Sequence, residues 1–165
     1  MRPNKSLTIL VSALLLSGIA GAKSTDRQQP MDITADNMDS LLTDTSESSI
    51  AGNVVISQGT LKIEADKAVV TRVKGDFTKV TLLGSSARLQ QTNDNGDTMR
   101  ASAREIVYFL GNDQIHLNGG VVIDQARGSM RGESIRYDIQ SGRLTGGNDG
   151  TRLQMRILPK NTEKN

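Results

Sequence analysis

The sequence GNVVISQGTLKIEADKAVV occupies residues 52–70, and the related sequence GGVVIDQARGSMRGESIRY occupies residues 119–137. Both alternate apolar and polar residues on either side of a short turn, which is the pattern of two strands joined by a hairpin. Shorter echoes, such as ITAD at 33–36 and IEAD at 63–66, extend the repeat. Four copies of one strand-turn-strand unit therefore fill residues 31–155, and such units are expected to stack into one continuous core.

The remaining chain follows the same pattern, and no segment after the N-terminal region shows a sustained helical period. Apolar and polar residues alternate over short runs that are broken by Gly, Asn and Asp, which predicts an all-β antiparallel meander. A change in the parity of the apolar positions beside Asp66 predicts a β-bulge. After a first strand that starts at Met31, the expected strands are 50–57, 61–73, 77–83, 87–91, 99–110, 114–118, 121–125, 129–139, 143–146 and 151–158.

The N-terminus has the layout of a secretory signal peptide. A basic start, a short apolar run and an A-x-A sequence fill residues 1–22. The apolar run is shorter than the roughly 20 residues of a membrane-spanning helix, although an uncleaved anchor is the alternative. We expect an exported chain with a flexible lead-in at 23–30, one domain at 31–158 and a disordered tail at 159–165.

Charge and composition argue against several functions. The chain has 20 Lys and Arg residues against 18 Asp and Glu residues, and removing Arg2 and Lys5 with the signal peptide leaves 18 of each. Nucleic-acid binding is therefore not expected, because it depends on a net basic surface. The absence of cysteine shows that stability does not come from disulfides and excludes a lipoprotein anchor.

The chain offers few candidates for catalysis or metal binding. Asp36, Asp66 and Glu133 recur at equivalent repeat positions, whereas a catalytic carboxylate pair needs two different roles at one place. We therefore place these acids at turns or bulges on the solvent side. His116 is the single histidine and is expected on the surface or in a cross-strand contact. No enzyme activity, metal site or cofactor is predicted.

The aliphatic positions of the strands leave two interpretations open. They could form a packed core, or they could line an incompletely closed groove that holds acyl chains. Burying a twelve-carbon chain is favourable by roughly 9 kcal/mol at about 0.8 kcal/mol per methylene. The positions are Ile33, Val54, Ile56, Ile63, Val70, Leu89, Ile106, Tyr108, Leu110, Val121, Ile123 and Ile135.

The last predicted strand, 151–158, has no proline within it and carries Leu153, Met155 and Ile157 on one face. An unprotected edge strand exposes unpaired N–H and C=O groups and is a template for pairing with another chain. Head-to-tail self-association through the terminal strands is therefore expected.

Several motifs resemble the OstA-like family of periplasmic lipopolysaccharide-transport proteins. They are QPMDITAD at 29–36, GNVVISQGTLKIEADKAVVTR at 52–72, an A-x-x-I-x-Y unit at 103–108 and an L-x-G-x-V-x-x-x-Q unit at 117–125. The resemblance implies an open, twisted antiparallel β-jellyroll of about sixteen strands. It also implies that copies join end to end between an inner-membrane subunit of the same fold and the N-terminal domain of an outer-membrane translocon, and that lipopolysaccharide moves along their shared groove.

The same resemblance implies contacts with the lipid A part of lipopolysaccharide. The motifs align the lipid-contacting positions of the family with Met31, Ile33, Arg72, Leu89, Tyr108 and Leu110. Leu89 departs from the pattern, because the family has an aromatic residue there. Two other functions remain as alternatives. One is a structural β-solenoid that polymerises through its edges without cargo, and the other is a polysaccharide-binding module, which the scarcity of aromatic residues disfavours.

Overall fold

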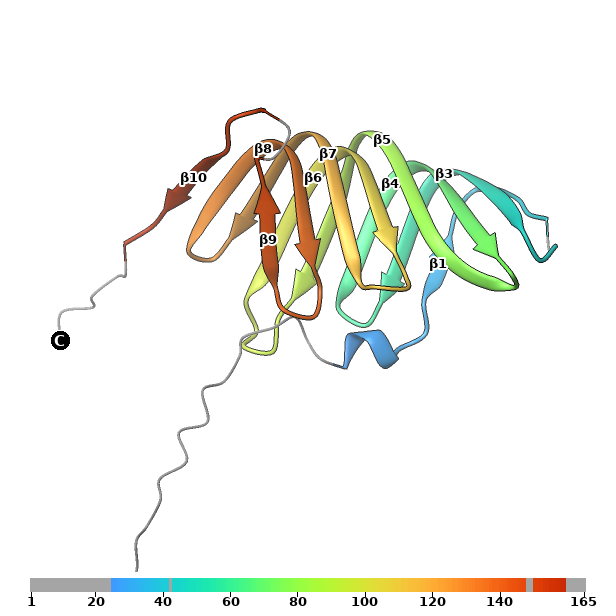
Figure 1. Ribbon diagram of the computed structural model, residues 1–165. Coiled ribbons are helices and arrows are strands. Elements are labelled where there is room, and N and C mark those ends of the chain that lie inside the picture. The colour runs from blue at the N-terminus through green and yellow to red at the C-terminus, as the bar shows by residue number, and fades with distance from the viewer. Residues whose placement is uncertain (1–24, 42, 148–149, 160–165) are drawn as a thin grey trace, which may run out of the picture.

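The computed structural model describes residues 25–41, 43–147 and 150–159, which form one antiparallel sheet of ten strands (Figure 1). A 3-10 turn, η1 (Asp26–Gln28), precedes the sheet. Among the residues described, no helix is long and apolar enough to cross a membrane. The strands are β1 (Asp32–Thr34), β2 (Asn37–Asp39), β3 (Ser46–Gln58), β4 (Leu61–Val73), β5 (Asp76–Thr92), β6 (Thr98–Phe109), β7 (Gln114–Gln125), β8 (Gly128–Asp138), β9 (Arg143–Gly146) and β10 (Gln154–Ile157).

The six long strands, β3 to β8, are each interrupted near their middle. The pairing register shifts at every interface between them, for example between Glu64 and Lys67 in β4. These bends divide the sheet into two half-sheets. The first half-sheet contains β1 and β10, and the second contains β2 and β9. In Figure 1 the long strands arch over the top of the molecule, and most hairpin turns lie along its lower edge.

This bend accounts for the strand number that the family resemblance implies. When each half of a bent strand is counted separately, the ten strands become sixteen segments, eight in each half-sheet. The all-β, open antiparallel fold is confirmed. The predicted segments 77–83 and 87–91 are the two halves of β5, and 114–118 and 121–125 are the two halves of β7.

Glycine is required where β3 and β7 bend. Gly52 has φ of +82°, and its repeat equivalent Gly119 has φ of +85°. A Cβ atom at Gly52 would lie 2.6 Å from Oδ2 of Asp36, and one at Gly119 would lie 2.5 Å from Nε of Arg104. Both the left-handed backbone and the lack of space make a side chain unfavourable at these positions.

The repeated acids occupy the same row of bends. Asp66 accepts a hydrogen bond of 3.0 Å from the backbone N–H of Ser85, and Glu133 accepts one of 3.1 Å from the N–H of Gly120. Asp36 accepts one of 2.8 Å from a neighbouring asparagine amide. The carboxylates thus accept hydrogen bonds on the solvent side, where the ladder of backbone hydrogen bonds is interrupted. Their predicted place at turns or bulges is confirmed.

The core lies between the half-sheets and is almost entirely aliphatic. Its side chains come from alternate residues of each strand, and the alternation changes parity across the bend in β4, from Ile63 to Ala68. The predicted bulge beside Asp66 is therefore confirmed. The largest of its fully buried side chains are those of Tyr108, Ile50, Ile56, Leu61, Ile63, Leu82, Leu89, Ile106, Ile115, Leu117, Ile123 and Ile135.

The ends differ more from the sequence-based expectations. The lead-in, expected to be flexible, contains η1, and Asp26 within it is only 4% exposed because its side chain contacts the sheet. β3 begins at Ser46, earlier than expected, and β10 is only four residues long. The predicted signal peptide, 1–22, lies outside the described residues, as does the tail after Pro159.

Candidate functional site

The edge of the molecule opposite the bends is an open mouth between the half-sheets. In the described ranges, no strand pairs across it, and side chains bridge it instead. The hydroxyl of Tyr108 donates to Oε1 of Gln58 at 3.1 Å, and that of Tyr137 donates to Oε1 of Gln91 at 2.9 Å. Burial raises the pKa of the Tyr137 phenol to about 12 and also raises the pKa of Tyr108. Both phenols therefore remain protonated donors at neutral pH.

An apolar cavity of about 290 Å³ opens at the mouth near β1. Residues of both half-sheets and of the segment before β1 form its walls. Four of the six predicted lipid-contacting residues are among them: Met31, Ile33, Tyr108 and Leu110. Met31 and Ile33 are half-buried, whereas Phe77 is 56% exposed. The complete lining is Arg27, Met31, Ile33, Gln58, Val70, Phe77, Val80, Tyr108 and Leu110.

Arg72 and Leu89 are not part of this lining. The Nε of Arg72 donates to the carbonyl of Gly75 at 2.8 Å, and its guanidinium lies 5.5 Å from the ring centroid of Phe77. Arg72 is thus connected to the apolar cavity through Phe77. Leu89 is 2% exposed and pairs with Ile63 and Ala101 in the first half-sheet. Its side chain is part of the core, so its predicted lipid contact stays a prediction.

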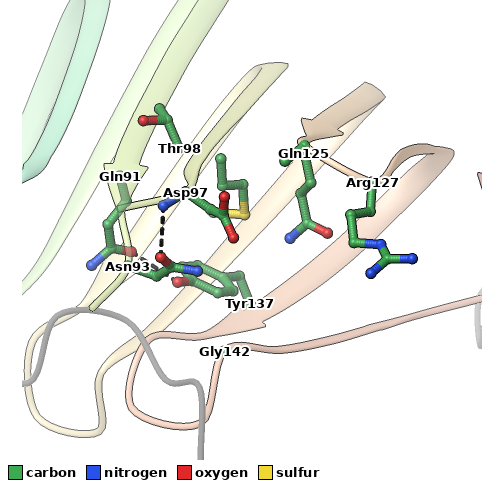
Figure 2. Close-up of a pocket in the computed structure, with 10 residues that line it drawn as sticks. Gln91, Asn93, Asp97, Thr98, Gln125, Arg127, Tyr137 and Gly142 are labelled. Carbon is green, nitrogen blue, oxygen red and sulfur yellow. Dashed lines mark hydrogen bonds between the residues drawn. The ribbon is translucent and has the colours of Figure 1, made fainter. Parts of the chain in front are cut away.

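A second, polar cavity of about 210 Å³ lies farther along the mouth, between the β5–β6 turn, the β7–β8 turn and Tyr137 of β8 (Figure 2). The backbone N–H of Asp97 donates to Oδ1 of Asn93 at 2.9 Å, which closes the turn between β5 and β6 at its side. In the sequence this turn is the polar run NDNGD at 93–97, which gives no local sign of a cavity. Its lining is Gln91, Asn93, Asp97, Thr98, Met99, Gln125, Ala126, Arg127, Tyr137 and Gly142.

The repeat does carry a signal for this pair of cavities. Tyr108 and Tyr137 are equivalent in the A-x-x-I-x-Y unit and its echo, and Gln58 and Gln125 are equivalent at the shift of 67 residues. The first member of each pair lines the apolar cavity, and the second lines the polar cavity. A repeated Tyr and Gln therefore marks two positions along one groove.

The described residues contain no group of three or more His, Cys, Asp or Glu side chains that could hold a metal ion. His116 lies in β7, where its ring centroid is 4.7 Å from that of Phe109 on the neighbouring strand β6. Burial, with a smaller effect of Arg136, lowers the pKa of His116. The cross-strand position predicted for this residue is confirmed.

Residues 32–143 match the family described as LptA/(LptD N-terminal domain) LPS transport protein. The chain belongs to this family. A curated relative in this family, the lipopolysaccharide export system protein LptA of Escherichia coli K12, is 33% identical over 155 residues, covering 92% of this chain and 83% of the relative. LptA of Haemophilus influenzae is 30% identical over 165 residues, covering 98% and 95% of the two chains. The OstA-like resemblance is thus confirmed.

A solved structure supports the same assignment. The crystal structure of LptH from Pseudomonas aeruginosa is described as the LptA-homologous periplasmic component of the conserved lipopolysaccharide transport device. It superposes with a TM-score of 0.75 at 25% identity, covering 82% of this chain and 99% of that structure. The bent, open antiparallel sheet is therefore the fold of this LPS transport family.

Proposed function

We propose that the protein carries lipopolysaccharide through the periplasm and shields its lipid A acyl chains in the groove between the half-sheets. The observation that carries this proposal is the apolar cavity at an open mouth, built from both half-sheets of a chain in the LPS transport family. Relatives are named lipopolysaccharide export proteins, and the similar LptH structure is described as periplasmic.

The shape of the groove suits an amphipathic cargo. Its interior is aliphatic, so it can replace water around acyl chains, which is favourable by about 0.8 kcal/mol per methylene buried. Its mouth leads directly to solvent and carries Arg27 and Gln58, which can face the polar part of a lipid. We infer a carrier rather than an enzyme, with energy supplied by ATP hydrolysis in a partner.

The ends of the sheet support a bridging role. β10 pairs only with β8 within the described residues, and its Met155 and Ile157 are 64% and 74% exposed. At the opposite end, Met38 and Leu41 are also exposed. Such apolar edges allow strand addition by another sheet.

We propose head-to-tail self-association through these edges. One end of the assembly would meet an inner-membrane subunit of the same fold, and the other would meet the N-terminal domain of an outer-membrane translocon. The family description includes the N-terminal domain of LptD, which supports a partner of similar fold.

Photo-crosslinking in living cells tests the cargo directly. A photoreactive residue is placed at Leu110, in the apolar cavity, and in a control variant at Asp94, on the exposed turn after β5. Adducts with lipopolysaccharide are expected at Leu110 but not at Asp94, and depletion of cellular ATP should reduce them. If the Leu110 variant were folded and abundant but gave no adduct, the structural scaffold would be favoured. The fully buried aliphatic residues would then serve only as a packed core.

A further inference from the structure

The N-terminal strap, which we define as residues 25–29, is attached to the first half-sheet at the mouth. It contains η1, drawn in blue at the lower edge of Figure 1, where the N–H of Gln29 donates to the carbonyl of Asp26 at 3.0 Å. The buried Asp26 carboxylate accepts hydrogen bonds from the hydroxyl of Thr60 and, at 3.5 Å, from the amide of Gln91. Thr60 lies in the turn between β3 and β4, and Gln91 is near the end of β5.

The next residue of the strap reaches the second half-sheet. Arg27 forms an ion pair with Asp113, which lies in the turn between β6 and β7 and is 2% exposed. Gln140 also donates to Asp113, at 3.0 Å, and the Asp113 carbonyl accepts from the N–H of Ile139. Two consecutive side chains of the strap, Asp26 and Arg27, thus point to opposite sides of the mouth.

The strap also lies between the two cavities. Arg27 lines the apolar cavity. Asp26 contacts Gln91, which lines the polar cavity and accepts a hydrogen bond there from the hydroxyl of Tyr137. A chain-like molecule moving along the mouth from one cavity to the other therefore meets the strap.

The attachment of the strap is suited to release. It consists of side-chain contacts, with no strand pairing, and η1 has no side-chain cap at its N-terminus. The Arg27 side chain of the ion pair is 33% exposed, so water reaches the pair and reduces its net contribution to stability. Opening the strap returns these groups to water and leaves the sheet intact.

We infer that the N-terminal strap is a displaceable partition, which the acyl chains of the cargo must move aside to pass from the apolar cavity towards β8. This inference rests on the proposed function, since it concerns how the same groove is traversed. The strap keeps the two cavities separate until a cargo molecule enters the apolar cavity.

A disulfide between Asp26→Cys and Thr60→Cys tests the inference, because the side chains of these residues are directly hydrogen-bonded and the natural chain has no cysteine. Purified protein is incubated with lipopolysaccharide and illuminated, with the photoreactive residue either at Leu110 or at Gln125, which lines the polar cavity. In the oxidised variant we expect the adduct at Leu110 to persist and the adduct at Gln125 to be lost. Reduction of the disulfide should restore the adduct at Gln125.

The control is a disulfide between Ser49→Cys and Val69→Cys, which are directly paired across β3 and β4, line neither cavity and do not include the strap. This disulfide should leave both adducts unchanged. Loosening the strap by Asp26→Ala should increase the adduct at Gln125 without changing that at Leu110.

Two results would overturn the inference. The first is an adduct at Gln125 that persists when the strap disulfide is formed, and the second is an adduct at Gln125 that does not increase in Asp26→Ala. Absence of adducts at both positions in the natural protein would instead contradict the proposed lipid transport itself.

Discussion

The hydroxyl of Tyr137 in the second half-sheet donates a hydrogen bond of 2.9 Å to Oε1 of Gln91 in the first. Tyr108 makes the same kind of bond to Gln58 at 3.1 Å, nearer to β1. Since Tyr108 and Tyr137 are equivalent in the repeat, the mouth is bridged twice by one recurring arrangement of neutral side chains.

Replacing Tyr137 by Phe should destabilise the protein by about 1–2 kcal/mol, because Oε1 of the buried Gln91 loses its donor. The free energy of unfolding in urea measures this loss. Tyr108→Phe is the matched control and should cost less, since Gln58 is half-buried and its lost hydrogen bond can be replaced by water. A larger loss for Tyr108→Phe would contradict this account of the mouth.

Alkaline pH should destabilise the protein through Tyr137. Its pKa is raised from 10 to about 12 in the folded state, so between these values the unfolded chain loses the proton first. The unfolded state then binds fewer protons, and the free energy of unfolding falls with rising pH, by roughly 2–3 kcal/mol in all. Urea titrations at pH 9 to 12 measure the slope. Tyr137→Phe should make it shallower, and an unchanged slope would rule out this residue as the cause.

Gly52→Ala should destabilise the protein by about 1–3 kcal/mol, because an L residue is strained at φ of +82° and its Cβ would press on Asp36. Gly111→Ala is the control, since a Cβ there meets no atom within 4 Å and its φ is not in the left-handed region. Thermal unfolding of the two variants measures the difference. Equal melting temperatures would show that the bend tolerates a side chain.

Ile33→Asp should block lipid passage while leaving the protein folded. Ile33 is half-buried in the short edge strand β1, so the carboxylate can reach solvent while it places a charge in the apolar cavity. Circular dichroism reports folding, and crosslinking from Leu110 reports cargo. Ile56→Asp, at a fully buried position, is expected to unfold the protein. If Ile33→Asp also unfolded it, the cavity would be part of a packed core, as the scaffold alternative requires.

Met155→Glu with Ile157→Glu should weaken self-association, because the like charges would oppose apolar contact at the exposed edge β10. Sedimentation velocity over a range of protein concentrations measures the effect. Leu83→Glu, a partly exposed site on β5 within the sheet, should leave self-association unchanged. If the sedimentation coefficients of the natural protein, the double variant and Leu83→Glu depended on concentration in the same way, β10 would be excluded as the associating edge.

Much of the fold could be predicted from local sequence patterns. The bounds of β4 and β9 agree with the expected strands, because alternation and turn residues are local signals. The fusion of two expected segments into β5 was not predicted, since Gly84–Ser85 reads as a break. In the structure the carboxylate of Asp66 in β4 accepts a hydrogen bond from the backbone N–H of Ser85. This contact with the neighbouring strand holds β5 together at its bend.

The candidate site was less predictable. Met31, Ile33, Tyr108 and Leu110, which the family motifs single out, line one cavity, and their contact with lipid stays a prediction. The strap was missed, because DRQ at 26–28 is a polar sequence and nothing local shows that Asp26 is buried. Its partners, Thr60, Gln91 and Asp113, are 34 to 86 residues away in the chain from the strap residues that they contact, so only the three-dimensional fold brings them together.

The two half-sheets share a continuous backbone along the row of bends but only side chains at the mouth. The molecule is therefore built as a clamp with a hinge on one side. Widening it would stretch the bulges and exchange a few side-chain hydrogen bonds with water, while every strand pair stays intact. We therefore expect the width of the groove to adapt to its cargo, so that one sequence could accept lipids that differ in the number or length of their acyl chains.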